Sequence, residues 1–187
     1  MPSYLDRCAG SLLGLACGDA VGAPVEFLPR RSFEPLVGMI GGGTFGLKPG
    51  QWTDDTSMAL CLAESLVETG GFDPADQLRR YLKWWREGYL SSTGEFFDIG
   101  GTTSRSLGRF ETTGDTYPGD QDPHGAGNGA LMRLAPIPLA YALNSTDAYE
   151  AAARSSRTTH GAEQSIDACR YFTGLIIGTL NGATKEE

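Results

Sequence analysis

The sequence has only two histidines and four cysteines in 187 residues, and no two cysteines form a Cys-x-x-Cys pair. A zinc site built from such ligands is therefore not expected. Basic residues are also few, since 15 Lys and Arg stand against 23 Asp and Glu and give a formal net charge of -8. This charge argues against nonspecific binding to nucleic acids or to anionic membranes.

Long apolar runs are scarce as well, because Gly, Asp, Arg or Glu interrupts each apolar stretch. We therefore expect no membrane-spanning segment. The N-terminus has an early acidic residue and no basic start before its apolar part, so a signal peptide is not expected. The four cysteines lie among apolar or small residues in helical patterns, and we interpret them as buried thiols of a cytoplasmic protein.

Strand-like alternation of apolar and polar residues is absent, whereas helical periodicity recurs along the chain. The helical patterns cover residues 4–20, 73–90, 145–156 and 158–180. With 40% hydrophobic residues, a chain of this length is large enough to build its own core. The sequence thus predicts an all-α fold and a single domain over residues 1–187.

Residue types at the helix starts support this interpretation. Asp73 is placed to cap a helix whose first position is Pro74. Ser145 or Thr146 is expected to cap the helix that follows. The first helix carries a glycine every fourth residue, which predicts close packing against another helix in the core; these residues are Gly10, Gly14, Gly18 and Gly22.

Two long connections, residues 28–51 and 111–129, are rich in Gly and Pro. Loops of this length in a domain are usually functional or mobile. The run from Gly41 to Gly46 has the glycine spacing of a phosphate-binding loop, but Leu47-Lys48-Pro49 follows where Gly-Lys-Ser or Gly-Lys-Thr is required. We interpret it as a flexible loop.

Thr53, Asp54 and Asp55 stand side by side at the start of a helical pattern and allow two interpretations. A threonine caps a helix through its hydroxyl, and acids in the first turn suit the helix dipole. Alternatively, the hydroxyl and carboxylates are ligands for a hard cation such as Mg²⁺, Mn²⁺ or Ca²⁺. Consecutive residues on a regular helix point about 100° apart, so only a helix start lets all three approach one site.

Five motifs occur in order along nearly the whole chain: residues 14–27, 51–66, 98–107, 127–139 and 158–169. Together they resemble the ADP-ribosylglycohydrolase family, which includes the dinitrogenase-reductase-activating glycohydrolases. The resemblance implies an all-α fold, two magnesium ions in a cleft, and hydrolysis of the bond between ribose C1″ of ADP-ribose and an acceptor. Mn²⁺ is a possible substitute for Mg²⁺.

The resemblance also implies roles for individual residues. Thr53, Asp54 and Asp55 match metal ligands, with Asp55 central to catalysis, and Glu26 matches a catalytic residue near the metals and the scissile bond. Asp98 matches a substrate-side acid of arginine-type members. The remaining matches are residues that contact ADP-ribose, namely Gly125, Gly127, Asn128, Gly129 and His160.

Each of these residues has a simpler interpretation. Glu26 is compatible with a solvated loop acid, and Asp98 with a cap for a helix that starts near Thr102. Asn128 between glycines is a turn signal, and a lone histidine such as His160 is more often a core or capping residue. Asp19 is expected to cap a helix or to pair with an arginine.

The sequence departs from the family pattern in one respect. No Asp-x-Asp-Thr motif, which in the family supplies further metal ligands on a C-terminal helix, is present. The chain is then a fragment, one part of a split protein completed by a second chain or a missing C-terminal segment, or a pseudoenzyme.

The function expected from the resemblance is Mg²⁺-dependent removal of ADP-ribose, with ADP-ribosyl-arginine on a protein as the first choice and a small-molecule ADP-ribose derivative as another. Its transition state would be oxocarbenium-like. The main alternative is an inactive ADP-ribose-binding or structural protein of the same fold. A metal-dependent phosphohydrolase is less well supported, because neither histidine has an Asp beside it.

Overall fold

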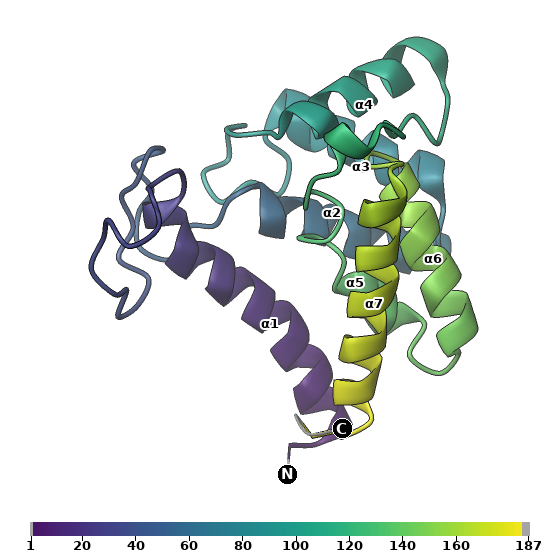
Figure 1. Ribbon diagram of the computed structural model, residues 1–187, viewed down its shortest axis with the longest axis horizontal. Helices are drawn as coiled ribbons and strands as arrows, with labels where there is room; N and C mark the ends of the chain where they lie inside the picture. Colours follow the sequence, from purple (N-terminus) through teal and green to yellow (C-terminus); the bar gives the residue numbers. More distant parts are fainter. Residues whose placement is uncertain (1, 185–187) are drawn as a thin grey trace.

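The computed structural model describes residues 2–184, and within them the protein is all-α, as the sequence predicts (Figure 1). Apart from two isolated bridges, no strand pairing is present in this part of the chain. The described residues form seven α-helices and two 3₁₀ turns: α1 (Tyr4–Gly22), η1 (Ala23–Val25), α2 (Asp54–Thr69), α3 (Pro74–Glu87), α4 (Gly101–Thr113), η2 (Pro123–Gly125), α5 (Pro136–Ala140), α6 (Ser145–Arg157) and α7 (Glu163–Leu180).

Side-chain caps explain where several helices begin. Asp73 accepts hydrogen bonds from the amides of Ala75 and Asp76, and Pro74 occupies the first position of α3, as predicted. The expected cap of α6 is wrong by one residue, because Asn144 accepts from the amide of Asp147. An amide side chain caps as well as a hydroxyl does, so residue type alone did not distinguish the two positions.

Helix α2 runs through the middle of the molecule and contributes to both hydrophobic clusters. Leu62 and Leu66 pack with α5, α6 and α7, while Met58 and Cys61 pack with α3 and α4. In α3 the indole of Trp84 is buried, whereas that of Trp85 is only partly buried. The packing of α2 on both sides thus fixes the position of its first turn, which contains Asp54 and Asp55.

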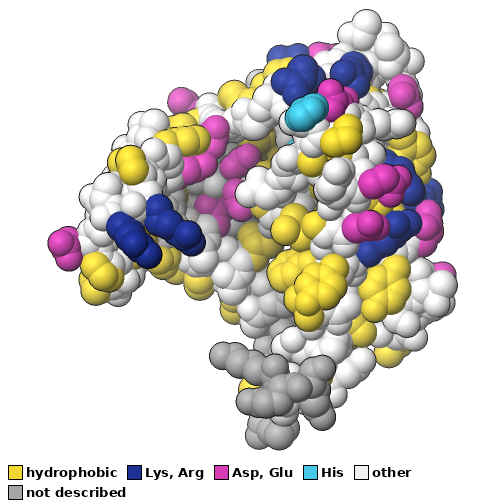
Figure 2. Space-filling model, in the orientation of Figure 1, with side chains coloured by type: hydrophobic (Ala, Val, Ile, Leu, Met, Phe, Trp, Pro, Cys, Tyr) yellow, Lys and Arg dark blue, Asp and Glu magenta, His cyan; other side chains and the backbone are white. Residues whose placement is uncertain are grey.

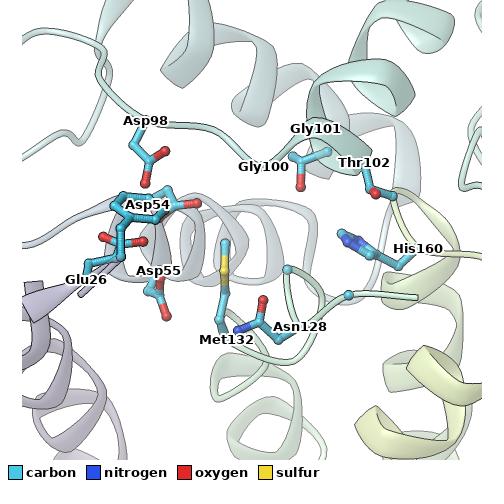
Figure 3. A pocket seen from close by; sticks show the side chains of 14 residues that line it. Glu26, Asp54, Asp55, Asp98, Gly100, Gly101, Thr102, Asn128, Met132 and His160 are labelled. Carbon is cyan, nitrogen blue, oxygen red and sulfur yellow. The ribbon is translucent and has the colours of Figure 1, made fainter. Parts of the chain in front are cut away.

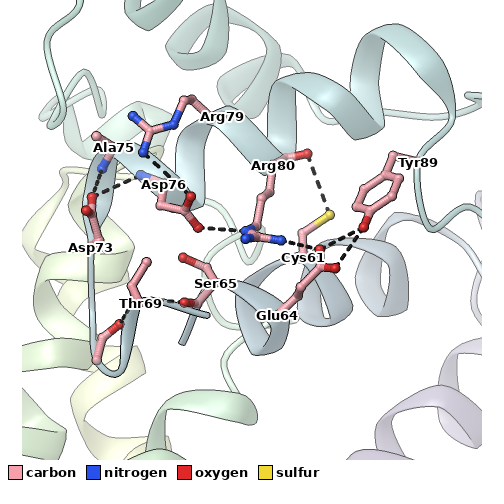
Figure 4. A network of polar contacts seen from close by, with 11 residues as sticks. Cys61, Glu64, Ser65, Thr69, Asp73, Ala75, Asp76, Arg79, Arg80 and Tyr89 are labelled. Carbon is pink, nitrogen blue, oxygen red and sulfur yellow. Dashed lines mark hydrogen bonds and ion pairs between the residues drawn. The ribbon is translucent and has the colours of Figure 1, made fainter. Parts of the chain in front are cut away.

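An ion-pair network ties α2 to α3 on the surface of this core (Figure 4). The Arg80 guanidinium donates to Asp76 at 2.6 Å and forms an ion pair with Glu64. Tyr89 donates its hydroxyl to the same Glu64 carboxylate at 2.8 Å. Arg80 and Asp76 both belong to α3, so it is the ion pair of Arg80 with Glu64 that links α3 to α2.

Helix α1 differs most from the expectations. Its glycines at positions 10, 14, 18 and 22 have no described atom within 4 Å of an added Cβ, so the predicted close helix packing along them is wrong for this structure. Cys17 is exposed and Cys8 is only partly buried, in contrast to the buried Cys61 and Cys169. The expectation of four buried thiols therefore holds for two of them.

The expectation about apolar length is also wrong for this helix. Residues Tyr4–Val25, with mean hydropathy 1.4, are long and apolar enough to span a membrane by length and composition. We do not propose a membrane span, because the Asp19 carboxylate, near the end of the same helix, is hydrogen-bonded to the start of α2 inside the domain.

The glycine run of the 28–51 connection forms a closed turn. Gly42 and Leu47 exchange backbone hydrogen bonds of 2.7 and 3.0 Å, which makes one of the isolated bridges. A Cβ at Gly43 would lie 2.8 Å from the carbonyl oxygen of Ala23, at the end of α1. The glycines thus allow the loop to pack on η1, beside Glu26.

Candidate functional site

A cavity of about 260 Å³ opens where five segments of the chain meet (Figure 3). Its lining residues come from the η1 turn, the start of α2, the segment before α4, the loop before α5, and the turn after α6. They are Glu26, Phe27, Asp54, Asp55, Asp98, Gly100, Gly101, Thr102, Thr103, Gly127, Asn128, Gly129, Met132 and His160. Figure 3 shows the four acids at one end and His160 with Thr102 at the other.

The acidic end is formed at the surface hollow beside the end of α1. Figure 2 shows acidic side chains gathered in this hollow. No Lys or Arg is among the lining residues of the cavity, although the negative groups include Glu26, Asp54, Asp55 and Asp98. An uncompensated group of carboxylates attracts cations, and each carboxylate raises the pKa values of the others.

The start of α2 is capped by a residue from another helix. Thr53 occupies the N-cap position but makes no capping bond; its hydroxyl donates to Asp19 at 2.8 Å. The Asp19 carboxylate also accepts the amides of Thr53 and Thr56, each at 3.0 Å, and the Thr56 hydroxyl at 2.6 Å. Thus the helix-cap interpretation holds for Asp19, whereas for the Thr53 side chain it is wrong.

Because Asp19 satisfies the helix terminus, Asp54 and Asp55 are left free to face the cavity. Asp54 is buried, with 8% of its surface exposed. Burial and the neighbouring charges, first that of Asp55 and then those of Asp98 and Glu26, raise the pKa of Asp54 to about 8. Burial and the charge of Asp19 raise the pKa of Asp55 to about 6. Neither carboxylate takes part in an ion pair within residues 2–184.

Glu26 and Asp98 complete the acidic end from two loops. Burial, with the charges of Asp98, Asp55 and Asp19, raises the pKa of half-buried Glu26 to about 7. Burial also raises the pKa of Asp98. Asp98 has φ +55°, and Phe27 beside Glu26 has φ +66°. Side chains other than glycine rarely adopt this conformation, and such residues concentrate at functional sites.

Asp98 does not cap a helix. Helix α4 begins at Gly101 with Gly100 at the N-cap position and no side-chain capping bond. The simpler interpretation of Asp98 is therefore wrong, and its strained backbone turns the carboxylate toward Asp54 and Glu26 (Figure 3).

The opposite end of the cavity is formed by a glycine loop lying against His160. A Cβ at Gly129 would lie 2.7 Å from Cε1 of His160, and one at Gly127 would lie 3.4 Å from Nε2. Glycines at these positions allow the backbone to approach the imidazole closely. Asn128 lines the cavity between them, while Gly125 lies outside the lining and faces the Asp120 carboxylate.

The predicted metal ligands satisfy the chemistry of a hard cation only in part. Asp54 and Asp55 face the cavity, and Thr53 lies beside them, engaged with Asp19. Within residues 2–184, however, no group of three or more His, Cys, Asp or Glu side chains has the geometry to hold a metal ion. A complete metal site requires further oxygen ligands in addition to these.

Several lining residues were not predicted from the sequence. Thr102, Met132 and the Gly100–Gly101 pair form the wall between the acids and His160. The glycine pair directly follows Asp98-Ile99, so its place in the motif was a usable signal. The sequence gives no signal that Met132 lines the cavity, because a methionine in an apolar stretch normally indicates a core position.

Known proteins resemble this chain in sequence and in fold. A family model described as ADP-ribosylglycohydrolase matches residues 1–187. An ADP-ribosylarginine hydrolase of Pseudomonas putida is 43% identical over 183 residues, which are 98% of this chain and 49% of that protein. An ADP-ribosyl-[dinitrogen reductase] glycohydrolase of Rhodospirillum rubrum is 38% identical over 194 residues, covering 100% of this chain and 63% of that protein.

A solved structure is similar over the entire chain. A chain of an ADP-ribosylglycohydrolase-related protein complex is 49% identical and superimposes with a TM-score of 0.87, covering 100% of this chain and 60% of its own. The present chain therefore spans about half to two thirds of the length of these similar proteins.

Proposed function

Because the chain belongs to the ADP-ribosylglycohydrolase family, we propose that the protein hydrolyses ADP-ribosyl linkages, with ADP-ribosyl-arginine on a protein as its substrate. The observation that carries the proposal is the cavity that joins an acidic end to a glycine-and-histidine end. An elongated ligand with a reacting ribose and a distant diphosphate suits such a cavity. The 43% identical ADP-ribosylarginine hydrolase supports arginine as the acceptor.

The cofactor we propose is Mg²⁺, with two ions in the complete site and Mn²⁺ as a substitute. The donor set fits, since carboxylates and a hydroxyl are hard oxygen ligands. Burial first, and then repulsion by neighbouring carboxylates, raises the pKa values of Asp54 and Asp55, and a divalent cation would offset that repulsion. When bound, Mg²⁺ supplies Lewis-acid polarisation and lowers the pKa of coordinated water.

Thr53, Asp54 and Asp55 would hold the ions at the start of α2. The further ligands that the geometry requires would come from a segment outside residues 1–187 or from a second chain. The similar proteins extend well beyond the matched region, which supports this proposal.

The loop acids would act on the reacting atoms. With a pKa raised to about 7, Glu26 is suited to accept a proton from the attacking water near neutral pH. Asp98, whose pKa is also raised, would hold or protonate the departing guanidine of arginine. Both carboxylates would also stabilise positive charge on the ribose as the glycosidic bond breaks.

The opposite end would bind the rest of ADP-ribose. Gly127 and Gly129 carry no side chains where they line the cavity, which would let their backbone amides lie close to a diphosphate. Asn128 and His160 would contribute side-chain contacts to the same part of the ligand. Gly125 would shape the loop from outside the cavity. The 28–51 connection, packed beside Glu26, would serve as a lid.

The proposal is tested by measuring ADP-ribose released from ADP-ribosyl-arginine with Mg²⁺ and with chelator. Mg²⁺-dependent release is expected, and Glu26→Gln or Asp98→Asn should reduce it by about 100-fold. Asp167→Asn, an exposed change on α7, serves as the control and should leave the rate unchanged. Equal rates in the Glu26 variant and the control would refute the assignment of Glu26.

One observation favours a second function, an ADP-ribose-binding protein without activity. The described residues hold no complete three-ligand metal group. Tight ADP-ribose binding that is insensitive to chelator, with no release in the assay above, would support this alternative. A cytoplasmic location, consistent with the two buried free thiols, is proposed in either case.

A further inference from the structure

Beneath the glycine loop lies a buried arginine that the proposed reaction does not use. Arg133 has none of its surface exposed, and no acidic side chain pairs with it within residues 2–184. Its Nη1 donates to the Gly129 carbonyl at 2.9 Å, and its guanidinium lies 4.7 Å from the Tyr81 ring centre. A buried charge without an acid is costly, so its presence calls for a compensating role.

The second arm of the guanidinium leads to His160. Arg133 Nη2 donates to the hydroxyl oxygen of Thr159 at 2.7 Å, and that oxygen lies 2.9 Å from Nδ1 of His160. Among the described residues, the Thr159 hydroxyl has no other hydrogen-bond partner. Since Arg133 can only donate, the threonine proton is free to be given to Nδ1. The ring proton of a neutral His160 then resides on Nε2.

The opposite assignment leaves a buried group unsatisfied. If Nδ1 carried the proton, the Thr159 oxygen would accept from both neighbours, and its own proton would have no acceptor. Thr159 is fully buried, so water offers no alternative. An unmade hydrogen bond of this kind costs more than a normal bond contributes. The geometry therefore selects one tautomer.

Burial and the surrounding charges disfavour the protonated form of the imidazole. Burial, then the positive charges of Arg133 and Arg105, lower the pKa of His160 to about 4. The neighbouring acid Asp120, whose backbone forms a bridge with His160, accepts from the Asp122 amide through its carboxylate and faces Gly125. Among the described residues, no acid is found among the groups that shift the pKa of His160.

We propose that Arg133 and Thr159 are positioning residues that hold His160 as a neutral Nε2–H donor for an acceptor oxygen of ADP-ribose. The inference rests on the proposed function for the identity of the ligand. It assigns the direction of the hydrogen bond: His160 donates to the ligand and does not accept a proton from it. Arg133 contacts two parts of the cavity wall: it reaches His160 through Thr159, and its Nη1 donates to the Gly129 carbonyl.

The tautomer is measured by ¹⁵N NMR of the His160 ring at pH 7 without ligand, which separates this test from the proposed function. A protonated Nε2 and an unprotonated Nδ1 are expected. In Thr159→Val the Nδ1–H form should become detectable, and Thr159→Ser should restore the single tautomer. Thr158→Val is the matched control, because it removes another Arg133 contact, at 3.3 Å, and leaves the Arg133–Thr159–His160 hydrogen bonds in place. This variant should keep the single tautomer.

Affinity for ADP-ribose, measured by calorimetry, tests the consequence. Thr159→Val should weaken binding about tenfold, the effect of one misdirected hydrogen bond, and Thr159→Ser and Thr158→Val should each stay within about threefold of the parent. An Nδ1–H or charged His160 in the parent, or an unchanged tautomer in Thr159→Val, would overturn the inference. If the tautomers behave as expected but ADP-ribose does not bind at all, the proposed function fails instead.

Discussion

Replacing Asp54 by Asn should stabilise the metal-free protein, and the gain should depend on pH. The folded structure raises the pKa of Asp54 from an ordinary 3.8 to about 8. Between these pH values the folded chain binds more protons than the unfolded chain, so Asp54 lowers stability progressively as the pH rises. Asparagine does not ionise. Its advantage should be absent near pH 4 and complete above pH 8.

The magnitude follows from the pKa difference. Each tenfold change in acidity corresponds to about 1.4 kcal/mol, so a rise from 3.8 to about 8 sets an upper limit of about 6 kcal/mol. Structural relaxation and entry of water reduce such penalties. We expect the free energy of unfolding of Asp54→Asn to exceed that of the parent by about 2 kcal/mol at pH 8.

Urea denaturation at pH 4 and pH 8 in the presence of chelator measures this difference. Asp147→Asn is the matched control, because Asp147 is also in the first turn of a helix but is exposed. Its stability should change by less than about 0.5 kcal/mol at either pH. A gain for Asp54→Asn that is equal at both pH values, or a loss at pH 8, would refute a raised pKa of Asp54 in the folded protein as the cause.

Three further predictions concern other parts of the molecule. Asp55→Asn should abolish Mg²⁺-dependent release of ADP-ribose, and unchanged turnover would contradict its role as a metal ligand. Gly129→Ala, whose Cβ would lie 2.7 Å from His160, should weaken ADP-ribose binding about tenfold by calorimetry, whereas Gly108→Ala, which meets no described atom within 4 Å, should not. Arg80→Met should lower the free energy of unfolding in urea by about 1–2 kcal/mol, because two carboxylates lose their partner; no change would mean the network does not hold α2 to α3.

Much of the fold was predictable because helical signals in this chain are local. Asp73 and Pro74 marked the start of α3 by their own chemistry, and the apolar spacing marked α7. The cap of α2 was not predictable in the same way. Asp19 lies 34 residues before Thr53, and nothing in either segment indicates that the two meet.

The candidate site shows the same limit. The family motifs identified eight of the fourteen residues that line the cavity, and their arrangement came only from the structure. Gly125 belongs to the same loop as Gly127 and Gly129 but lies outside the lining. Loop residues two positions apart can point in opposite directions. Sequence spacing determines the direction in which residues point only in regular helices and strands.

The Asp19 cap changes how the acids at the start of α2 are understood. Asp54 and Asp55 occupy the first turn of a helix, where acids normally interact favourably with the backbone amides. Here Asp19, from another helix, accepts the amide hydrogen bonds at the start of α2. The carboxylates of Asp54 and Asp55 instead lie near other carboxylates that repel them, in a cavity without a lining Lys or Arg. Such an arrangement lowers the stability of the isolated chain. A cation at the acidic end of the cavity would offset the repulsion among these carboxylates. The pH-dependent gain in stability of Asp54→Asn should therefore disappear when Mg²⁺ is bound to the parent protein.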